Sequence, residues 1–194
     1  MDKKNVVEFF DRLAPQWDDD MVRDEDVINT ILNNAGITKG VSVLDVACGT
    51  GVLIPDYLIR NVSSVIGVDI SANMIRLAKE KFSDPRVTFI CADAETSRFE
   101  EVFDRCVIYN AFPHFPSPYL LMRNLASCLK TGGILTIAHG LSRQQIDSHH
   151  MEHASSVSVG LMSDDELSAL LSPYFDVVVT ISDDRMQQIT GIKR

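Results

Sequence analysis

The sequence predicts an α/β fold, in which a doubly wound and mostly parallel sheet carries helices on both faces. Strand-like segments alternate with helical segments along most of the chain, and repeated strand-helix-strand units require right-handed crossovers and a covered sheet. The 194 residues are 45% hydrophobic, which is enough to bury one sizeable core. Because no Pro/Gly/Ser-rich linker or repeat divides the chain, we expect residues 1–194 to form a single domain.

Seven segments have the composition and length of strands. They are residues 41–46, 62–69, 87–92, 103–109, 133–139, 175–182 and 186–192. Helical segments separate the first five, so these five are expected to run parallel. Only a few residues, around Asp183 and Asp184, join the last two, and these two must therefore pair antiparallel.

Helices are predicted between the early strands because apolar residues recur there at helical spacing. The predicted helices are residues 52–60, 72–82 and 119–130. Ser71 is a natural N-cap for the second, and Gly132 is expected to end the third. Ser163, followed by three acidic residues, should cap a further helix, since acids suit the positive end of the helix dipole.

The charge of the chain limits the classes of partner. A net charge of -9 and an isoelectric point near 4.9 give no general attraction for nucleic acid or anionic lipid. The N-terminus has no apolar signal-peptide region, and no run of about 18 apolar residues occurs. We therefore expect a cytoplasmic protein that binds neither nucleic acid nor a membrane.

The four cysteines do not have the spacing of a metal or disulfide framework. They are Cys48, Cys91, Cys106 and Cys128. No pair forms a CxxC motif, and most lie in segments predicted to be core strands. We expect reduced, mostly buried side chains.

The stretch VLDVACGTGVL, residues 43–53, joins the first strand to the first helix. A doubly wound sheet binds its ligand at this kind of turn. Gly49 and Gly51 allow positive φ angles and a close approach of the backbone to a bound molecule. The glycines alone would equally suit a tight turn with no ligand.

Three acidic residues favour a ligand. Asp69 ends the second strand, 20 positions after Gly49, where an acidic side chain can accept from both hydroxyls of a ribose. Asp93 ends the third strand, within reach of an adenine edge. Asp45 precedes the glycines, and its carboxylate would repel a pyrophosphate. S-adenosylmethionine, which has no phosphate and carries an ammonium and a sulfonium, fits this pattern.

These motifs resemble those of the class I S-adenosylmethionine-dependent methyltransferases. The matching segments are VLDVACGTG, VIGVDISANMI, CADAE and LKTGGILTIAHG, in this order. The resemblance implies a seven-stranded sheet of order 3-2-1-4-5-7-6 with strand 7 antiparallel. The lead-in FFDRLAPQWDD is similar to that of the ubiquinone and menaquinone C-methyltransferase group. One departure is Ala47, which stands where the family usually has the first glycine.

The resemblance also implies the residues of the cofactor site. For the methionine part of the cofactor they are Asp45 and the backbone of Ala47, Gly49 and Gly51. For the ribose, adenine and sulfonium they are Asp69, Ile70, Met74, Asp93, Ala94 and Asn110. Packing in the core without cofactor contact is an equal alternative for Ile70 and Met74. Residues 1 to about 36, which include Trp17, are expected to form a helical lid.

All five histidines fall within 40 residues. They are His114, His139, His149, His150 and His153. One interpretation is general base catalysis by His114, His139 or His150. A second is a divalent metal on His139, His149 and His153, since two histidines four residues apart on a helix form a common half-site. The third is that these histidines are structural or solvated.

The sequence therefore predicts methyl transfer from S-adenosylmethionine to a small-molecule acceptor, by a chain for which we consider a homodimer. One alternative is a nicotinamide-dependent oxidoreductase with a Rossmann sheet. It is disfavoured because Ile54 replaces the third glycine of G-x-G-x-x-G and because Asp45 would face a pyrophosphate. The other is an S-adenosylmethionine-binding protein without transfer activity.

Overall fold

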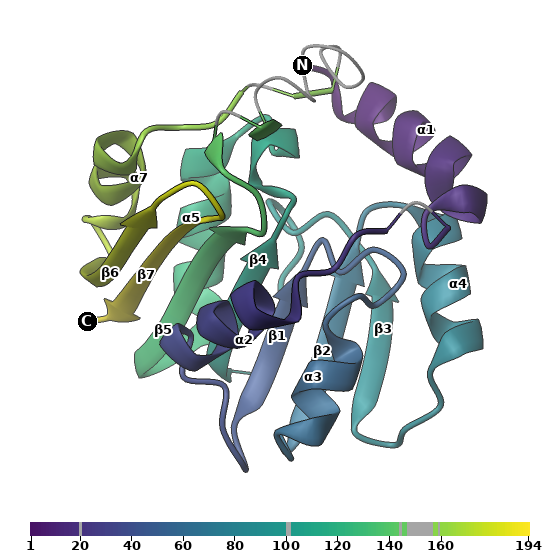
Figure 1. Ribbon diagram of the computed structural model, residues 1–194, viewed down its shortest axis with the longest axis horizontal. Coiled ribbons are helices and arrows are strands. Elements are labelled where there is room, and N and C mark those ends of the chain that lie inside the picture. The colour runs from purple at the N-terminus through teal and green to yellow at the C-terminus, as the bar shows by residue number, and fades with distance from the viewer. Residues whose placement is uncertain (20, 100–101, 144, 147–156, 159) are drawn as a thin grey trace.

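Seven strands form one mixed sheet in the order β3-β2-β1-β4-β5-β7-β6 (Figure 1). The computed structural model describes residues 1–19, 21–99, 102–143, 145–146, 157–158 and 160–194. The strands are β1 (Ser42–Val46), β2 (Ser64–Asp69), β3 (Val87–Cys91), β4 (Phe103–Tyr109), β5 (Leu129–His139), β6 (Phe175–Ser182) and β7 (Gln187–Lys193). This order and the antiparallel β7 confirm the predicted fold class.

The topology places a crevice at the carboxyl ends of β1 and β4. Strands β1 to β5 pair in parallel, whereas β7 runs antiparallel to both β5 and β6. From β1 the chain first builds outward through β2 and β3, then returns to the other side of β1 with β4. Ligands of open α/β sheets bind where the strand order reverses in this way.

Helices cover both faces of the sheet. The α-helices are α1 (Lys3–Leu13), α2 (Glu25–Asn34), α3 (Ile54–Ile59), α4 (Ala72–Lys81), α5 (Pro118–Cys128) and α7 (Asp164–Leu171); η1 (Ala14–Gln16) and η2 (Phe112–His114) are short 3-10 turns. Apolar residues of α2, α3 and α4 share one core cluster, and those of α5 and α7 share the other. Figure 1 shows α1 apart from both layers, beyond the carboxyl ends of β1 to β3.

The alternation of side chains in the strands creates these two cores. Leu44 and Val46 of β1 pack on the side of α5, while Val43, which precedes Leu44, packs on the side of α2 and α3. Successive strand residues face opposite sides of a sheet, so a strand with helices on both sides must be apolar throughout. Asp45 is the buried exception in β1.

Two predicted helix starts are confirmed. The hydroxyl of Ser71 accepts a hydrogen bond from the backbone N–H of Met74 at the start of α4. Ser163 forms a reciprocal capping box with Glu166 at the start of α7. Each cap satisfies N–H groups that the first turn of a helix leaves without a partner.

The predicted end of the helix at 119–130 is wrong. Helix α5 ends at Cys128, and β5 begins at Leu129, four residues before the predicted strand. Leu129 is buried and pairs with Phe103 of β4, so its apolar side chain serves the sheet and not the helix. Gly132, with a φ of +77°, allows the irregular backbone within β5 and does not cap the helix.

No helix in the described part of the chain is long and apolar enough to cross a membrane.

We predict that Gly51→Ala destabilises the fold more than Gly40→Ala. Both glycines have positive φ angles, +90° and +86°, but a Cβ on Gly51 would lie 2.7 Å from the ring of Phe82, whereas one on Gly40 meets nothing within 4 Å. Both variants should lose about 1 kcal/mol to backbone strain. Gly51→Ala should lose about 1–3 kcal/mol more through overpacking. Urea unfolding measures both, and equal losses would contradict the packing at Gly51.

Candidate functional site

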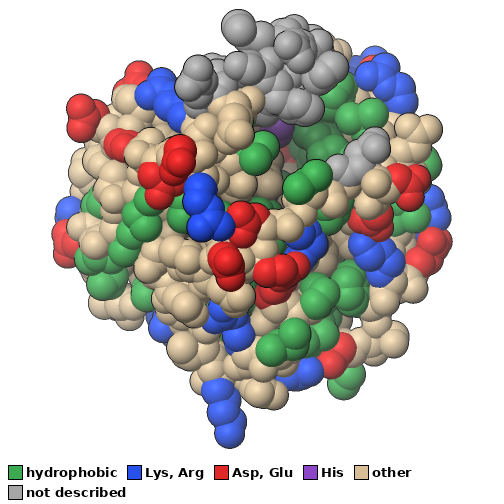
Figure 2. Space-filling view, viewed as in Figure 1, with side chains coloured by type: hydrophobic (Ala, Val, Ile, Leu, Met, Phe, Trp, Pro, Cys, Tyr) green, Lys and Arg blue, Asp and Glu red, His purple; other side chains and the backbone are tan. Residues whose placement is uncertain are grey.

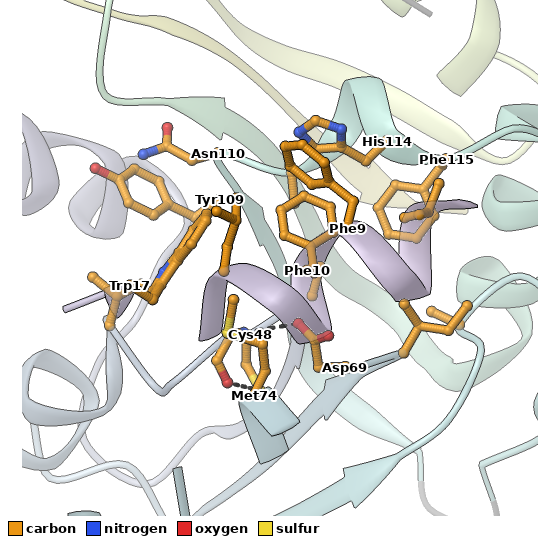
Figure 3. Close-up of a pocket in the computed structure, with 18 of the residues that line it drawn as sticks. Phe9, Phe10, Trp17, Cys48, Asp69, Met74, Tyr109, Asn110, His114 and Phe115 are labelled. Carbon is orange, nitrogen blue, oxygen red and sulfur yellow. Dashed lines mark hydrogen bonds between the residues drawn. The ribbon is translucent and has the colours of Figure 1, made fainter. Parts of the chain in front are cut away.

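A cavity of about 830 Å³ opens at the carboxyl ends of β1 to β5, within the size range of small-molecule sites. Its walls come from the loops after these strands and from the inner side of α1. In Figure 2, hydrophobic side chains gather around a hollow at this end of the molecule. Figure 3 shows Phe9 and Phe10, on α1, with His114 above them and Asp69 below.

The loop after β1 approaches the cavity with its backbone. Ala47, Gly49 and Gly51 all have positive φ angles, +55°, +55° and +90°. A Cβ on Gly49 would lie 3.7 Å from the indole nitrogen of Trp17, so the glycine keeps open the space between loop and indole. Ala47 occupies a conformation that favours glycine, and this costs about 1 kcal/mol or more. The structure thereby explains why a glycine is usual at that position.

Asp69 ties the loop after β1 to the start of α4. Its Oδ2 accepts a hydrogen bond from the N–H of Gly49 at 2.9 Å, and its Oδ1 accepts one from the N–H of Ser71 at 2.8 Å. The side chain lines the cavity. Burial raises the pKa of Asp69, while the two backbone donors oppose this rise. Each carboxylate oxygen has a further lone pair for a hydroxyl of a ligand.

Hydrogen bonds and ion pairs hold the N-terminal segment against the site at three places. Asp11 of α1 accepts hydrogen bonds from the Ser71 hydroxyl at 2.5 Å and from the Asn73 N–H at 3.1 Å. Asp18 accepts from the hydroxyl of Thr50 and pairs with the ammonium of Lys81. The third contact is made by the ion pairs of Lys3. Together these contacts hold α1 over the cavity.

Lys3 reaches two carboxylates at the far end of the cavity. Its Nζ lies 2.6 Å from Asp93 and 2.5 Å from the buried Glu95. Although burial opposes it, the hydrogen bond from Lys3 lowers the pKa of Asp93. Glu95 also accepts from the N–H of Ser117 at 2.6 Å, just before α5. The lid is therefore linked to the elements that follow both β3 and β4.

The cavity-lining part of the N-terminal segment is shorter than the lid predicted at 1–36. Its lining residues lie between Lys3 and Val22. Helix α2 instead packs on the sheet, with Ile28, Ile31 and Leu32 completely buried. Hence α1 and the residues that follow it cover the cavity, and α2 belongs to the core.

Eight of the ten predicted cofactor residues line the cavity. They are Ala47, Gly49, Asp69, Ile70, Met74, Asp93, Ala94 and Asn110. Asn110 has a φ of +54°, and its Oδ1 accepts from the N–H of Gly140, which joins the ends of β4 and β5. Gly51 and Asp45 do not belong to the wall. Gly51 faces Phe82.

Asp45 lies beneath the loop. Because it alternates with Leu44 and Val46, its side chain projects toward the layer of α3. Burial raises the pKa of Asp45 to about 8, and the nearby charge of Asp69 adds to the rise. Asp45 does not line the cavity, and its predicted role toward the methionine part of a cofactor stays a prediction.

Two of the five histidines lie in the described part of the chain, and both line the cavity. His139 ends β5 and is buried. The Nδ1 of His114 lies 2.7 Å from the carbonyl oxygen of Val157, and its ring packs edge-to-face against Phe10, with centroids 5.0 Å apart. A carbonyl can only accept, so Nδ1 carries the proton and the lone pair of the neutral ring is on Nε2.

The remaining histidines predicted to act, His149, His150 and His153, lie outside the described residues. Among the described residues, no group of three histidine, cysteine, aspartate or glutamate side chains could hold a metal ion. The predicted metal site on His139, His149 and His153 stays a prediction.

Sequence reasoning missed several residues of the site. Phe9, Phe10, Tyr109 and Glu95 all line the cavity. The apolar spacing of Val6, Phe9, Phe10 and Leu13 is a helical stripe and could have indicated the inner side of a lid. The pairing of Lys3 with acids some 90 positions away has no signal in a single sequence.

Comparison with known proteins identifies the domain type. A family model described as a methyltransferase domain matches residues 43–133. The chain is similar to the malonyl-(acyl-carrier protein) O-methyltransferase of Priestia megaterium, with 32% identity over 56% of this chain and 40% of that protein. It is also similar to the ubiquinone biosynthesis O-methyltransferase of Coxiella burnetii, with 28% identity over 70% of this chain and 61% of that protein. The chain thus spans about half the length of these curated relatives.

Solved structures share the fold. One is magnesium protoporphyrin IX methyltransferase from Synechocystis with bound SAH, with a TM-score of 0.74, 17% identity and full coverage of both chains. Another is a complex of the Haloferax volcanii Trm112 methyltransferase activator with a methyltransferase, with a TM-score of 0.76, 16% identity and coverage of 95% of this chain and 97% of that chain. At these identities the likeness shows the fold alone.

We predict that Lys3→Met loosens the lid. Removing the ammonium leaves the buried carboxylate of Glu95 without its cation, which should lower the free energy of unfolding by about 1–2 kcal/mol after allowance for the partly exposed lysine. Acrylamide quenching of Trp17, the single tryptophan, should increase. Lys4→Met is the matched control, because Lys4 is exposed and pairs only loosely with Glu8 at 3.6 Å. Identical behaviour of the two variants would contradict the role of Lys3.

We predict that Asp45 makes stability fall as the pH rises. Its native pKa of about 8 exceeds the value of about 3.9 in an unfolded chain. Between these values the native state holds a proton that the unfolded state has released. Stability should therefore fall by up to about 1.4 kcal/mol per pH unit. Asp45→Asn should lack this contribution. Urea unfolding from about pH 5 to pH 8 measures the free energy of unfolding of both proteins. If the two free energies change with pH in parallel, the raised pKa of Asp45 is refuted.

Proposed function

Because this chain belongs to the class I S-adenosylmethionine-dependent methyltransferases, we propose that it transfers a methyl group from S-adenosylmethionine to a small-molecule acceptor. The observation that carries the proposal is the hydrogen bond from the N–H of Gly49, in the loop after β1, to Asp69. Both residues line a cavity of the size that small molecules occupy. Both curated relatives are named as O-methyltransferases, and this supports the proposed methyl transfer.

The residues of the cavity fit the proposed cofactor. Asp69 would accept hydrogen bonds from the ribose hydroxyls, since its side chain lines the cavity at the end of β2. Ile70 and Met74 would pack on the adenine, and Asp93 with Ala94 would bind its amino edge. Among the described residues, the part of the wall beside the loop after β1 has no lysine or arginine that could neutralise a pyrophosphate.

When bound, S-adenosylmethionine supplies the electrophilic methyl group. The chain must then orient the acceptor in line with it, exclude water and remove a proton where the acceptor carries one. Helix α1 covers the cavity and would exclude water. Asn110, which the Gly140 N–H fixes at the end of β4, would lie below the sulfonium.

We assign the general base to His114 in this proposal. The Val157 carbonyl fixes the ring with the proton on Nδ1, so Nε2 would accept the proton that the acceptor loses. His139, at the end of β5, is the second candidate. The divalent metal, the cytoplasmic location and the homodimer stay predictions, and no step above depends on them.

A nicotinamide-dependent oxidoreductase fits the site less well. Ile54 occupies the position of the third glycine and is fully buried at the start of α3, where a glycine would allow the close approach of a dinucleotide. The carboxylate of Asp69 beside the loop also disfavours a pyrophosphate.

We predict that Asp69→Asn weakens the binding of S-adenosylhomocysteine about tenfold to hundredfold. The amide replaces a charged acceptor of hydroxyl and backbone donors, which costs about 1–3 kcal/mol. Titration calorimetry on folded protein measures the change. Asp176→Asn is the matched control, since Asp176 pairs with Arg194 on the exposed edge of β6, away from the cavity.

Two results would contradict the proposal. Unchanged affinity in folded Asp69→Asn would place the ribose elsewhere. Binding of NADH by the unmodified protein, without binding of S-adenosylhomocysteine, would favour the oxidoreductase.

A further inference from the structure

We infer that the methyl acceptor is an uncharged, predominantly apolar molecule that carries a single proton-bearing nucleophile. The inference rests on the proposed function and concerns the half of the cavity that the cofactor residues do not occupy. We call this half the acceptor region. It is lined by Val6, Phe9, Phe10, Tyr109, Ala111, His114, Phe115, Pro116, His139, Leu141 and Ile146.

The acceptor region is built mainly from aromatic and aliphatic side chains. The rings of Phe9 and Phe10 meet edge-to-face with centroids 5.2 Å apart, and Phe10 meets Trp17 in the same way at 5.7 Å. Figure 3 shows Phe10 and Phe115 on either side of Phe9, with His114 above them. Leu141 is 46% exposed, so an apolar side chain also stands where the region meets solvent. Such a wall gains free energy by covering apolar surface of a ligand.

Among the described residues that line the acceptor region, none is an acid, a lysine or an arginine. Two cations elsewhere in the described wall, Lys3 and Arg12, are engaged in other ways. Lys3 lies between Asp93 and Glu95, and the guanidinium of Arg12 stands 5.5 Å from the ring centre of Phe9 on the exposed side of α1. A carboxylate or phosphate entering the region would lose its hydration, and the described side chains that line the region would offer it no ion pair in return.

The described polar side chains of the region are two histidines and a tyrosine. His114 and His139 come from the segments after β4 and at the end of β5. The phenol of Tyr109 lies beside Asn110 (Figure 3), and it stays neutral because burial raises its pKa. One hydroxyl, thiol or acidic carbon of the acceptor would be deprotonated at His114, whereas the rest of the molecule would contact mainly apolar side chains.

The test compares two dyes that share one ring system and differ in charge. N-phenylnaphthylamine is neutral, and anilinonaphthalenesulfonate adds a sulfonate. With saturating S-adenosylhomocysteine present, we expect the neutral dye to bind with a Kd at least about tenfold lower than that of the sulfonate. Dye fluorescence, excited through Trp17 as well as directly, gives both affinities. Equal or tighter binding of the sulfonate, or no binding of the neutral dye, overturns the inference.

A pair of variants locates the dye. Phe9→Lys places a cation in the wall of the acceptor region. It should weaken the binding of the neutral dye and strengthen the binding of the sulfonate dye. Tyr119→Lys makes the same change at a side chain that is 74% exposed and outside the cavity, and it should alter neither affinity. If both variants behave alike, the dyes bind elsewhere and the inference fails.

Calorimetry with S-adenosylhomocysteine on the same samples separates this inference from the proposed function. Cofactor binding together with a preference for the sulfonate overturns the acceptor class alone. A preference for the neutral dye without cofactor binding leaves an apolar site and overturns the proposed function.

Discussion

The carboxylate of Asp69 is the constraint on which the rest of the site depends. It accepts from the N–H of Gly49 and from that of Ser71, and so it fixes the loop after β1 relative to the start of α4. Ser71 in turn caps α4 and donates to Asp11 of α1. One buried acid thus positions the backbone wall of the cavity, the adjacent helix and the lid above it. Asp69 lies at the end of β2, and the parallel pairing of β2 with β1 brings this end beside the loop after β1.

The distribution of charge divides the cavity into two chemical environments. Acids line the part beside β2 and β3, where Lys3 joins Asp93 and Glu95 to α1. The described residues beside β4 and β5 are apolar apart from His114, His139, Tyr109 and Asn110. A polar adenosine derivative suits the first environment and an apolar acceptor the second. Residues of α1 line both parts of the cavity, so the position of this helix affects both environments.

The sequence predicted the sheet, and eight of its ten proposed cofactor residues line the cavity, because these features are local. The strand periodicity, the glycine loop and the acids at strand ends each lie within a few residues, and parallel topology brings the strand ends together. Leu129 was assigned to a helix because its period fits α5, whereas its burial against β4 decided otherwise. Asp45 belongs to the same motif as the glycine loop, and strand alternation places its side chain beneath the loop, on the side of α3. The ion pairs of Lys3 depend on how the lid docks, which no single-sequence pattern encodes.

A crystal structure with S-adenosylhomocysteine tests the central claim most directly. The account predicts the ribose hydroxyls against Asp69, the adenine between Ile70, Met74 and Asp93, and α1 closed over the ligand with Asp11 still bound to Ser71. It also predicts that the sulfur atom faces the acceptor region beside His114. A ligand bound outside this cavity, or a ribose that makes no contact with Asp69, would contradict the account.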